Sequence, residues 1–125
     1  TLLLSPSIAF AEWVFKLQVH KKSGTLADTY IDSEFKKDGN TVYVWFLSDF
    51  VESTDNSEKA GTSRTSRNEY DCGAMRMRHV ARYNWAGPMG TGTPTREVPD
   101  LKWIHASPGS NVYIHMQLRC SEAGL

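Results

Sequence analysis

The side chains of this 125-residue sequence that could do chemistry are two cysteines, four histidines and a short run of arginines. In an oxidising compartment Cys72 and Cys120 are expected to form a disulfide, whereas in a reducing one they would be buried or reactive thiols. A nucleophilic cysteine needs a neighbouring base, and the spacing of His79 and His115 singles out neither of them. The residues therefore favour a structural disulfide, with a reactive thiol as the alternative.

The histidines and acidic residues form no recognisable catalytic or metal-binding pattern. Asp32 and Asp49 follow predicted strands and would make a paired-carboxylate or cation site only if they met in space, whereas turn capping is the ordinary role of aspartates there. No Gly-x-Ser-x-Gly turn or phosphate-binding loop is present. We therefore expect no enzyme, no metal and no cofactor. The histidines occur singly, without metal-ligand spacing, at His20, His79, His105 and His115.

A basic and aromatic stretch offers binding chemistry instead. Arg76, Arg78 and Arg82 recur at period two, so a strand would project them from one face at successive spacings of roughly 7 Å, with a gap at Val80. Such a strip suits sulfated glycans or the acidic segments of a host glycoprotein; otherwise it is a solvated face whose arginines pair with nearby acids. Trp85 lies in a loop rich in glycine and proline and is the tryptophan expected to be exposed for contacts.

Length and charge restrict the class of protein. A chain of 125 residues is the size of one domain. Its 14 Lys and Arg are balanced by 14 Asp and Glu, which excludes general nucleic-acid binding through a global basic charge. Aromatic residues make up 11% of the chain, so the mean hydropathy of -0.44 reflects polar loops and not disorder. No apolar run is long enough for a transmembrane helix.

The amino terminus indicates export. An apolar stretch over residues 2–10 leads into Ala9-Phe10-Ala11, the small-x-small pattern that precedes signal-peptide cleavage. We expect residues 1–11 to be a signal-peptide remnant or apolar segment and residues 12–125 to be the domain. No cysteine follows the predicted cut to accept a lipid, which favours a periplasmic or secreted state. If the segment is retained, it could add a strand to a neighbouring protomer, as in a structural subunit of an extracellular or periplasmic assembly or a homo-oligomer.

The remaining chain is read mostly as strands. Residues 110–121 are ambiguous, because their apolar residues alternate as in a strand, yet Ser110 could begin a helix and Gly124 could end it. A turn is predicted at residues 38–40 and a loop at residues 52–61. Strands are predicted over residues 12–22, in a short segment ending at residue 32, over residues 41–50 in the sheet centre with both faces covered, over residues 62–71 and 75–83, and at an edge near residues 95–98.

Several short motifs follow one another along the chain, namely Trp13, YID at 30–32, VWFLSDF at 44–50, Ser63 or Ser66 before YDC at 70–72, RY at 82–83, MGTG at 89–92, KWIHASPGS at 102–110 and Cys120. Their order resembles that of the surface-adhesin protein E family. The resemblance implies an α+β fold, in which a single twisted antiparallel sheet of about six strands carries a C-terminal helix tied to it by a disulfide. Residues 110–121 would then be the helix, with Cys72 on the sheet and Cys120 on the helix. It further implies adhesion to host matrix or plasma glycoproteins from a bacterial surface, without chemistry.

Overall fold

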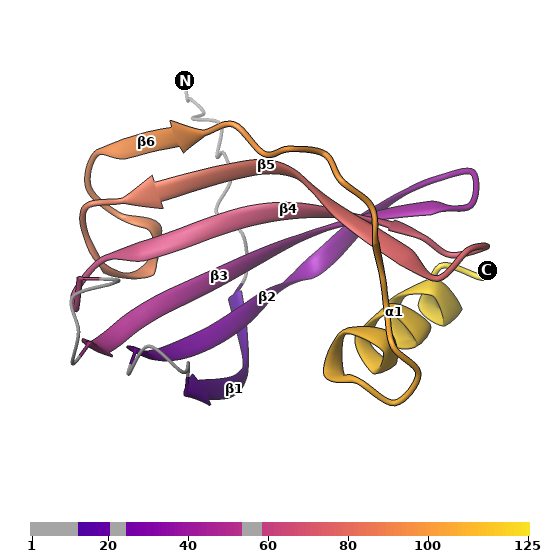
Figure 1. Ribbon diagram of the computed structural model, residues 1–125, viewed down its shortest axis with the longest axis horizontal. Coiled ribbons are helices and arrows are strands. Elements are labelled where there is room, and N and C mark those ends of the chain that lie inside the picture. Colours follow the sequence, from indigo (N-terminus) through magenta and orange to yellow (C-terminus); the bar gives the residue numbers. More distant parts are fainter. Residues whose placement is uncertain (1–12, 21–24, 54–58) are drawn as a thin grey trace, which may run out of the picture.

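The computed structural model describes residues 13–20, 25–53 and 59–125 of the chain. These residues form a seven-stranded antiparallel sheet and a C-terminal helix (Figure 1). The sheet order is β1-β2-β3-β4-β5-β6, and β7 pairs with β5. The elements are β1 (Trp13–His20), β2 (Thr25–Asp38), β3 (Thr41–Ser53), β4 (Ser63–Asp71), β5 (Arg76–Trp85), the 3-10 turn η1 (Pro88–Gly90), β6 (Pro94–Glu97), β7 (Ile104–His105) and α1 (Asn111–Glu122). The predicted fold class is confirmed.

The second strand is longer than the sequence predicts. A polar run after Ile31 reads as the end of a strand, but β2 continues to Asp38. A register irregularity between Ile31 and Phe35 absorbs the polar residues, and Phe35 then resumes pairing opposite Val44. The hairpin closes at Gly39, whose φ of +62° lies in the left-handed region that glycine adopts readily. The predicted turn at residues 38–40 is therefore confirmed, and the predicted end at residue 32 is wrong.

The core lies between one face of the sheet and α1. The central strand β3 places Val42 and Val44 there, and both side chains are fully buried. Tyr70 of β4, Met77 of β5 and Met116 of α1 complete this cluster. We call this side of the sheet the helix-side face.

The opposite face of β3 is only partly covered, contrary to the prediction for residues 41–50. Tyr43 and Trp45 alternate with the buried valines and are half-buried. Further along the strand, Leu47 is fully buried beside Gly90 of η1. Coverage of this face within the described residues therefore comes from a turn at one end of the strand.

The C-terminal segment is a helix with a defined start. The Ser110 hydroxyl accepts a hydrogen bond from the Tyr113 amide at 3.2 Å, which satisfies one of the unpaired donors of the first turn. Arg119 is buried and donates to the Asp32 carbonyl oxygen at 3.1 Å, so α1 also contacts β2. The strand that the alternation of residues 112–120 predicts is therefore wrong, and the helix implied by the family resemblance is confirmed.

Among the described residues, no helix has both the length and the apolar character that crossing a membrane requires. Residues 1–11, with the predicted export signal, lie outside the described part of the chain.

Candidate functional site

The three arginines of β5 do not share one face of the sheet. Arg78 pairs with Glu69 of β4, whereas Arg82 pairs with Ser66. Directly paired residues project to the same side, and β4 alternates without interruption, so Ser66 and Glu69 project to opposite faces. Arg76 lies on the same side as Arg78. The prediction of one continuous basic strip is therefore wrong.

A single extra residue in β5 causes this division. Arg67 of β4 pairs with Ala81, but the next residue, Asn68, pairs with His79. Val80 is thus left without a partner of its own on β4, as in a β-bulge. The bulge shifts the strand by one residue. Arginines at every second position of the sequence therefore project to opposite faces of the sheet before and after Val80.

Arg76 and Arg78 are held by carboxylates and by one tryptophan. The Arg76 Nε lies 2.9 Å from the Asp71 carboxylate, and the Arg78 Nε lies 2.7 Å from Glu69. The hydrogen bond from Arg76 lowers the pKa of the Asp71 carboxyl below its ordinary value. Each guanidinium also lies 4.2 Å from the ring centroid of Trp103. These two arginines are therefore already paired within the chain.

Arg82 joins two strands on the helix-side face. Its Nη1 lies 2.8 Å from the Glu97 carboxylate on β6, and the Asn84 side chain donates to the same carboxylate at 3.0 Å. These hydrogen bonds, that from Arg82 first, lower the pKa of Glu97. Arg82 thus fastens the edge strand β6 to β5.

Trp85 is not an exposed loop residue. It is the last residue of β5 and is half-buried, and its indole Nε1 donates to the Thr65 hydroxyl at 2.9 Å. Its ring lies 6.5 Å from that of Tyr83, which in turn stacks with Trp45 at 6.4 Å. The tryptophan that sequence reasoning selected is therefore one member of an aromatic row.

Arg67 occupies a different position from the other arginines of the sheet. Its guanidinium lies 4.6 Å from the ring centroid of Tyr43, and it forms no ion pair with a described carboxylate. It lies directly opposite Trp45 in the pairing of β3 with β4. We define the arginine–aromatic face by aromatic and charged residues that share this side of the sheet, namely Lys36, Tyr43, Trp45, Arg67, Glu69, Arg76, Arg78, Tyr83, Trp85 and Trp103.

The arginine–aromatic face contains a shallow hollow of about 520 Å³. Arg67 and Arg78 border it, and Glu69 supplies an acceptor beside them. Sequence reasoning missed Tyr43, Trp45 and Arg67. The sequence does carry a signal for them, because Tyr43 and Trp45 occupy alternate positions of β3, as Arg67 and Glu69 do in β4. That these residues share one face becomes clear only when the pairing of the two strands is known.

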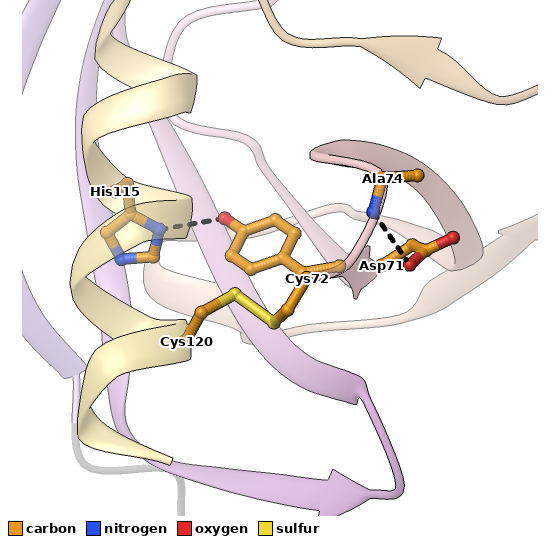
Figure 2. Close-up of a disulfide and its surroundings, with 6 residues drawn as sticks. Asp71, Cys72, Ala74, His115 and Cys120 are labelled. Atoms are coloured by element: carbon orange, nitrogen blue, oxygen red, sulfur yellow. Dashed lines mark hydrogen bonds between the residues drawn. A yellow bond between two sulfur atoms is a disulfide. The ribbon is translucent and has the colours of Figure 1, made fainter. Parts of the chain in front are cut away.

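The predicted disulfide between Cys72 and Cys120 is present, with an S–S distance of 2.01 Å. Figure 2 shows Cys120 and His115 on the side of α1 that faces Cys72. Next to the disulfide, the Tyr70 hydroxyl and the His115 Nδ1 are 2.7 Å apart. Burial raises the pKa of the Tyr70 phenol above its ordinary value, so the phenol stays neutral. The reactive-thiol alternative is excluded, because both sulfurs are bonded.

The family model for surface-adhesin protein E matches residues 17–121. This chain belongs to the surface-adhesin protein E family. No curated protein matches the chain.

Solved structures share the fold of this family member. Crystal form II of Haemophilus influenzae protein E is similar with a TM-score of 0.64 at 16% identity, over 100% of both chains. Protein E from non-typeable Haemophilus influenzae has a TM-score of 0.61 at 15% identity, covering 98% of this chain and 85% of the other. At these identities the likeness establishes a common fold.

The two aspartates considered from the sequence do not form a pair in this family member. Asp49 lies opposite Asp28 in the register of β2 and β3, and its carboxylate accepts a hydrogen bond from the Met89 amide at 2.9 Å. The Asp32 carboxylate accepts one from the Glu34 amide at 3.0 Å. Asp49 lies inside β3 and thus connects this strand to η1, whereas Asp32 bonds the backbone within the irregular stretch of β2, so the predicted position of both after a strand is wrong. The described residues also contain no group of three or more His, Cys, Asp or Glu side chains suited to a metal ion.

Proposed function

We propose that this protein is an exported, non-catalytic adhesin that attaches to host matrix or plasma glycoproteins through the arginine–aromatic face. Family membership supports a surface adhesin. The single observation that supports this face as the contact surface is Arg67, stacked over Tyr43 and opposite Trp45 without a carboxylate partner among the described residues.

The composition of the face supports contact with a protein partner. Tryptophan, tyrosine and arginine are the residues most enriched among those that dominate binding energy at protein interfaces. Trp45, Tyr83 and Arg67 are half-buried on neighbouring strands. Because each is held by strand pairing, little conformational freedom remains to be lost on binding.

The charge of the face supports an acidic or sulfated group on the partner. Arg76 and Arg78 are already paired with Asp71 and Glu69, whereas Arg67 and the exposed Lys36 border the hollow without an ion pair among the described residues. We propose that the Arg67 guanidinium contacts a sulfate of a glycan or a carboxylate of the host glycoprotein. Such a contact weakens as salt rises, because screening acts most strongly on exposed charges.

The experiment compares binding of purified variants to immobilised basement-membrane extract and to heparin. We expect Arg67→Gln and Trp45→Ala each to weaken binding by about tenfold or more, the loss typical of a central interface residue. Lys37→Gln is the matched control, because it removes one exposed positive charge from a residue whose register partner, Val42, faces the helix. If Arg67→Gln and Lys37→Gln bind like the wild type, this face is not the adhesive surface.

A structural role in an extracellular assembly is the second proposal. Among the described strands β1 forms one edge of the sheet and pairs with β2 alone, so its other side can accept a further strand. Deleting residues 1–10 is then expected to disperse a homo-oligomer in analytical ultracentrifugation. An unchanged sedimentation coefficient would oppose this role.

A further inference from the structure

The helix-side face contains a cleft of about 710 Å³, on the opposite side of the sheet from the arginine–aromatic face. Its floor is the sheet, through Ile31, Phe46 and Met77, and one wall is α1, through Ile114 and Leu118. The segment 104–107 forms the other wall. The volume falls within the range of about 300–1,000 Å³ that is usual for small-molecule sites.

The apolar side chains at the rim of the cleft are unusually exposed. Ile104 of β7 is 49% exposed, and Ile114 and Leu118 of α1 are 55% and 49% exposed. Single exposed apolar residues are common, but a group that converges on one concave site indicates a binding surface. These residues are not needed to seat the helix, because α1 buries Met116 and Cys120 against the sheet instead.

The described lining of the cleft lacks lysine, arginine, aspartate and glutamate. These residues make up 22% of the chain, but none of those that the structure describes borders the cleft. Among its polar groups, His79 lies 2.7 Å from the Asn68 side-chain oxygen, and burial lowers the pKa of His79, which favours the neutral ring. The Tyr70 phenol is likewise neutral. An occupant therefore meets no Lys, Arg, Asp or Glu side chain among the described residues that line this site.

We propose that the cleft binds the single hydrocarbon chain of a free, uncharged amphiphile, such as a monoacylglycerol, with its hydroxylated head at the mouth. The chain replaces water on the half-exposed rim residues, and burial of its methylenes favours binding through the hydrophobic effect. At the mouth, the exposed side chains of His105, Ser107 and Asn111 supply hydrogen-bonding groups for the head.

A peptide is a poorer occupant than a hydrocarbon chain. Every residue of an extended peptide brings an N–H and a C=O group that must be satisfied when buried. In the floor of the cleft, Ile31, Phe46 and Met77 provide no strong donors or acceptors. The Tyr70 and His79 side chains beside them already bond to His115 and Asn68. A hydrocarbon chain imposes no such requirement.

The test uses the full chain with the neutral fluorophore N-phenyl-1-naphthylamine, displaced by 1-decanoylglycerol below its aggregation concentration. We expect saturable binding at one site and displacement by the monoglyceride. Leu118→Lys should weaken the binding of the fluorophore and of the monoglyceride by about tenfold or more, because it places a charge beside the buried hydrocarbon chain. Val98→Lys is the matched control, since Val98 is 86% exposed and does not line the cleft. Circular dichroism establishes that both variants fold.

Four outcomes would overturn the proposal. The first is equal affinity of Leu118→Lys, Val98→Lys and the wild type. The second is displacement by apolar peptides but not by 1-decanoylglycerol, which indicates a peptide groove. The third is about tenfold tighter binding of decanoate, which indicates an anionic head. The last is binding to phosphatidylcholine vesicles without binding of the monomeric monoglyceride, which indicates a membrane surface.

Discussion

The two faces of this sheet use the same types of side chain in opposite ways. On the helix-side face, Tyr70 is buried, neutral and hydrogen-bonded to His115 beneath a helix that a disulfide holds in place. On the arginine–aromatic face, Tyr43 is half-buried under the guanidinium of Arg67. The helix-side face therefore carries most of the stability, while the arginine–aromatic face can change with little effect on folding.

The largest expected effect comes from removing the disulfide that fixes the helix. Cys72→Ser combined with Cys120→Ser opens a loop of roughly 50 residues, for which chain entropy predicts a loss of about 4 kcal/mol in the free energy of unfolding. Urea denaturation of the double variant measures this loss. A loss below about 1 kcal/mol would mean that the helix needs no cross-link, and the contrast between the faces would weaken.

The second prediction compares one hydroxyl on each face. Tyr70→Phe removes a buried hydrogen bond of 2.7 Å and is expected to lower the free energy of unfolding by about 1–2 kcal/mol. Tyr43→Phe removes a contact of 3.5 Å between the phenol and Glu69 and should cost under about 0.5 kcal/mol. Equal losses in urea denaturation would contradict the distinction between the faces.

The third prediction concerns pH and the helix-side face. Burial first, and then the nearby charge of Arg82, lower the pKa of His79 below its ordinary value of 6.5, so the folded state binds a proton less readily than the unfolded state. The contribution of neutral His79 is therefore present above about pH 6.5 and is lost as the pH falls below it. We expect His79→Gln to lose less thermal stability than the wild type between about pH 7.5 and pH 5.5. An identical loss in both proteins would contradict this expectation.

The last prediction concerns an ion pair on the arginine–aromatic face. Arg78→Met removes the ion pair with Glu69 but keeps an apolar side chain beside Trp103. The Arg78 side chain is 30% exposed and that of Glu69 is 12% exposed, so the pair is partly screened and we expect a loss of about 1 kcal/mol. A loss above about 2 kcal/mol in urea denaturation would give this face a structural role comparable to that of the helix-side face.

Local patterns in the sequence predict most of the fold. The alternation of Val42, Tyr43 and Val44 identifies the central strand, and the Gly39 turn identifies its hairpin. The helix α1 is different, because its two apolar sides, one buried at Met116 and one exposed at Ile114, together imitate the alternation of a strand. Periodicity cannot separate these cases, and the family resemblance was needed.

The candidate site was less predictable than the fold. The position of Arg82 depends on the bulge at Val80, and a bulge follows from how two strands pair and not from the residues of one of them. Arg67 and Tyr43 lie far enough apart along the chain that their contact depends on the register of β3 and β4. The disulfide could be predicted from the sequence, because two cysteines in an exported chain allow a single intramolecular pairing.

The disulfide also determines how the molecule transmits a mechanical pull. Tension applied between Trp13 and the C-terminal Leu125 passes from β4 directly to Cys120 through the sulfur–sulfur bond, and bypasses the 48 residue steps between the two cysteines. That bypassed segment includes β5, β6, β7 and most of α1. At roughly 3.4 Å per residue, about 160 Å of chain is thus withheld from extension. Under load, strands β1 to β4 separate while the segment that carries Trp103 and most of the helix remains a closed covalent loop.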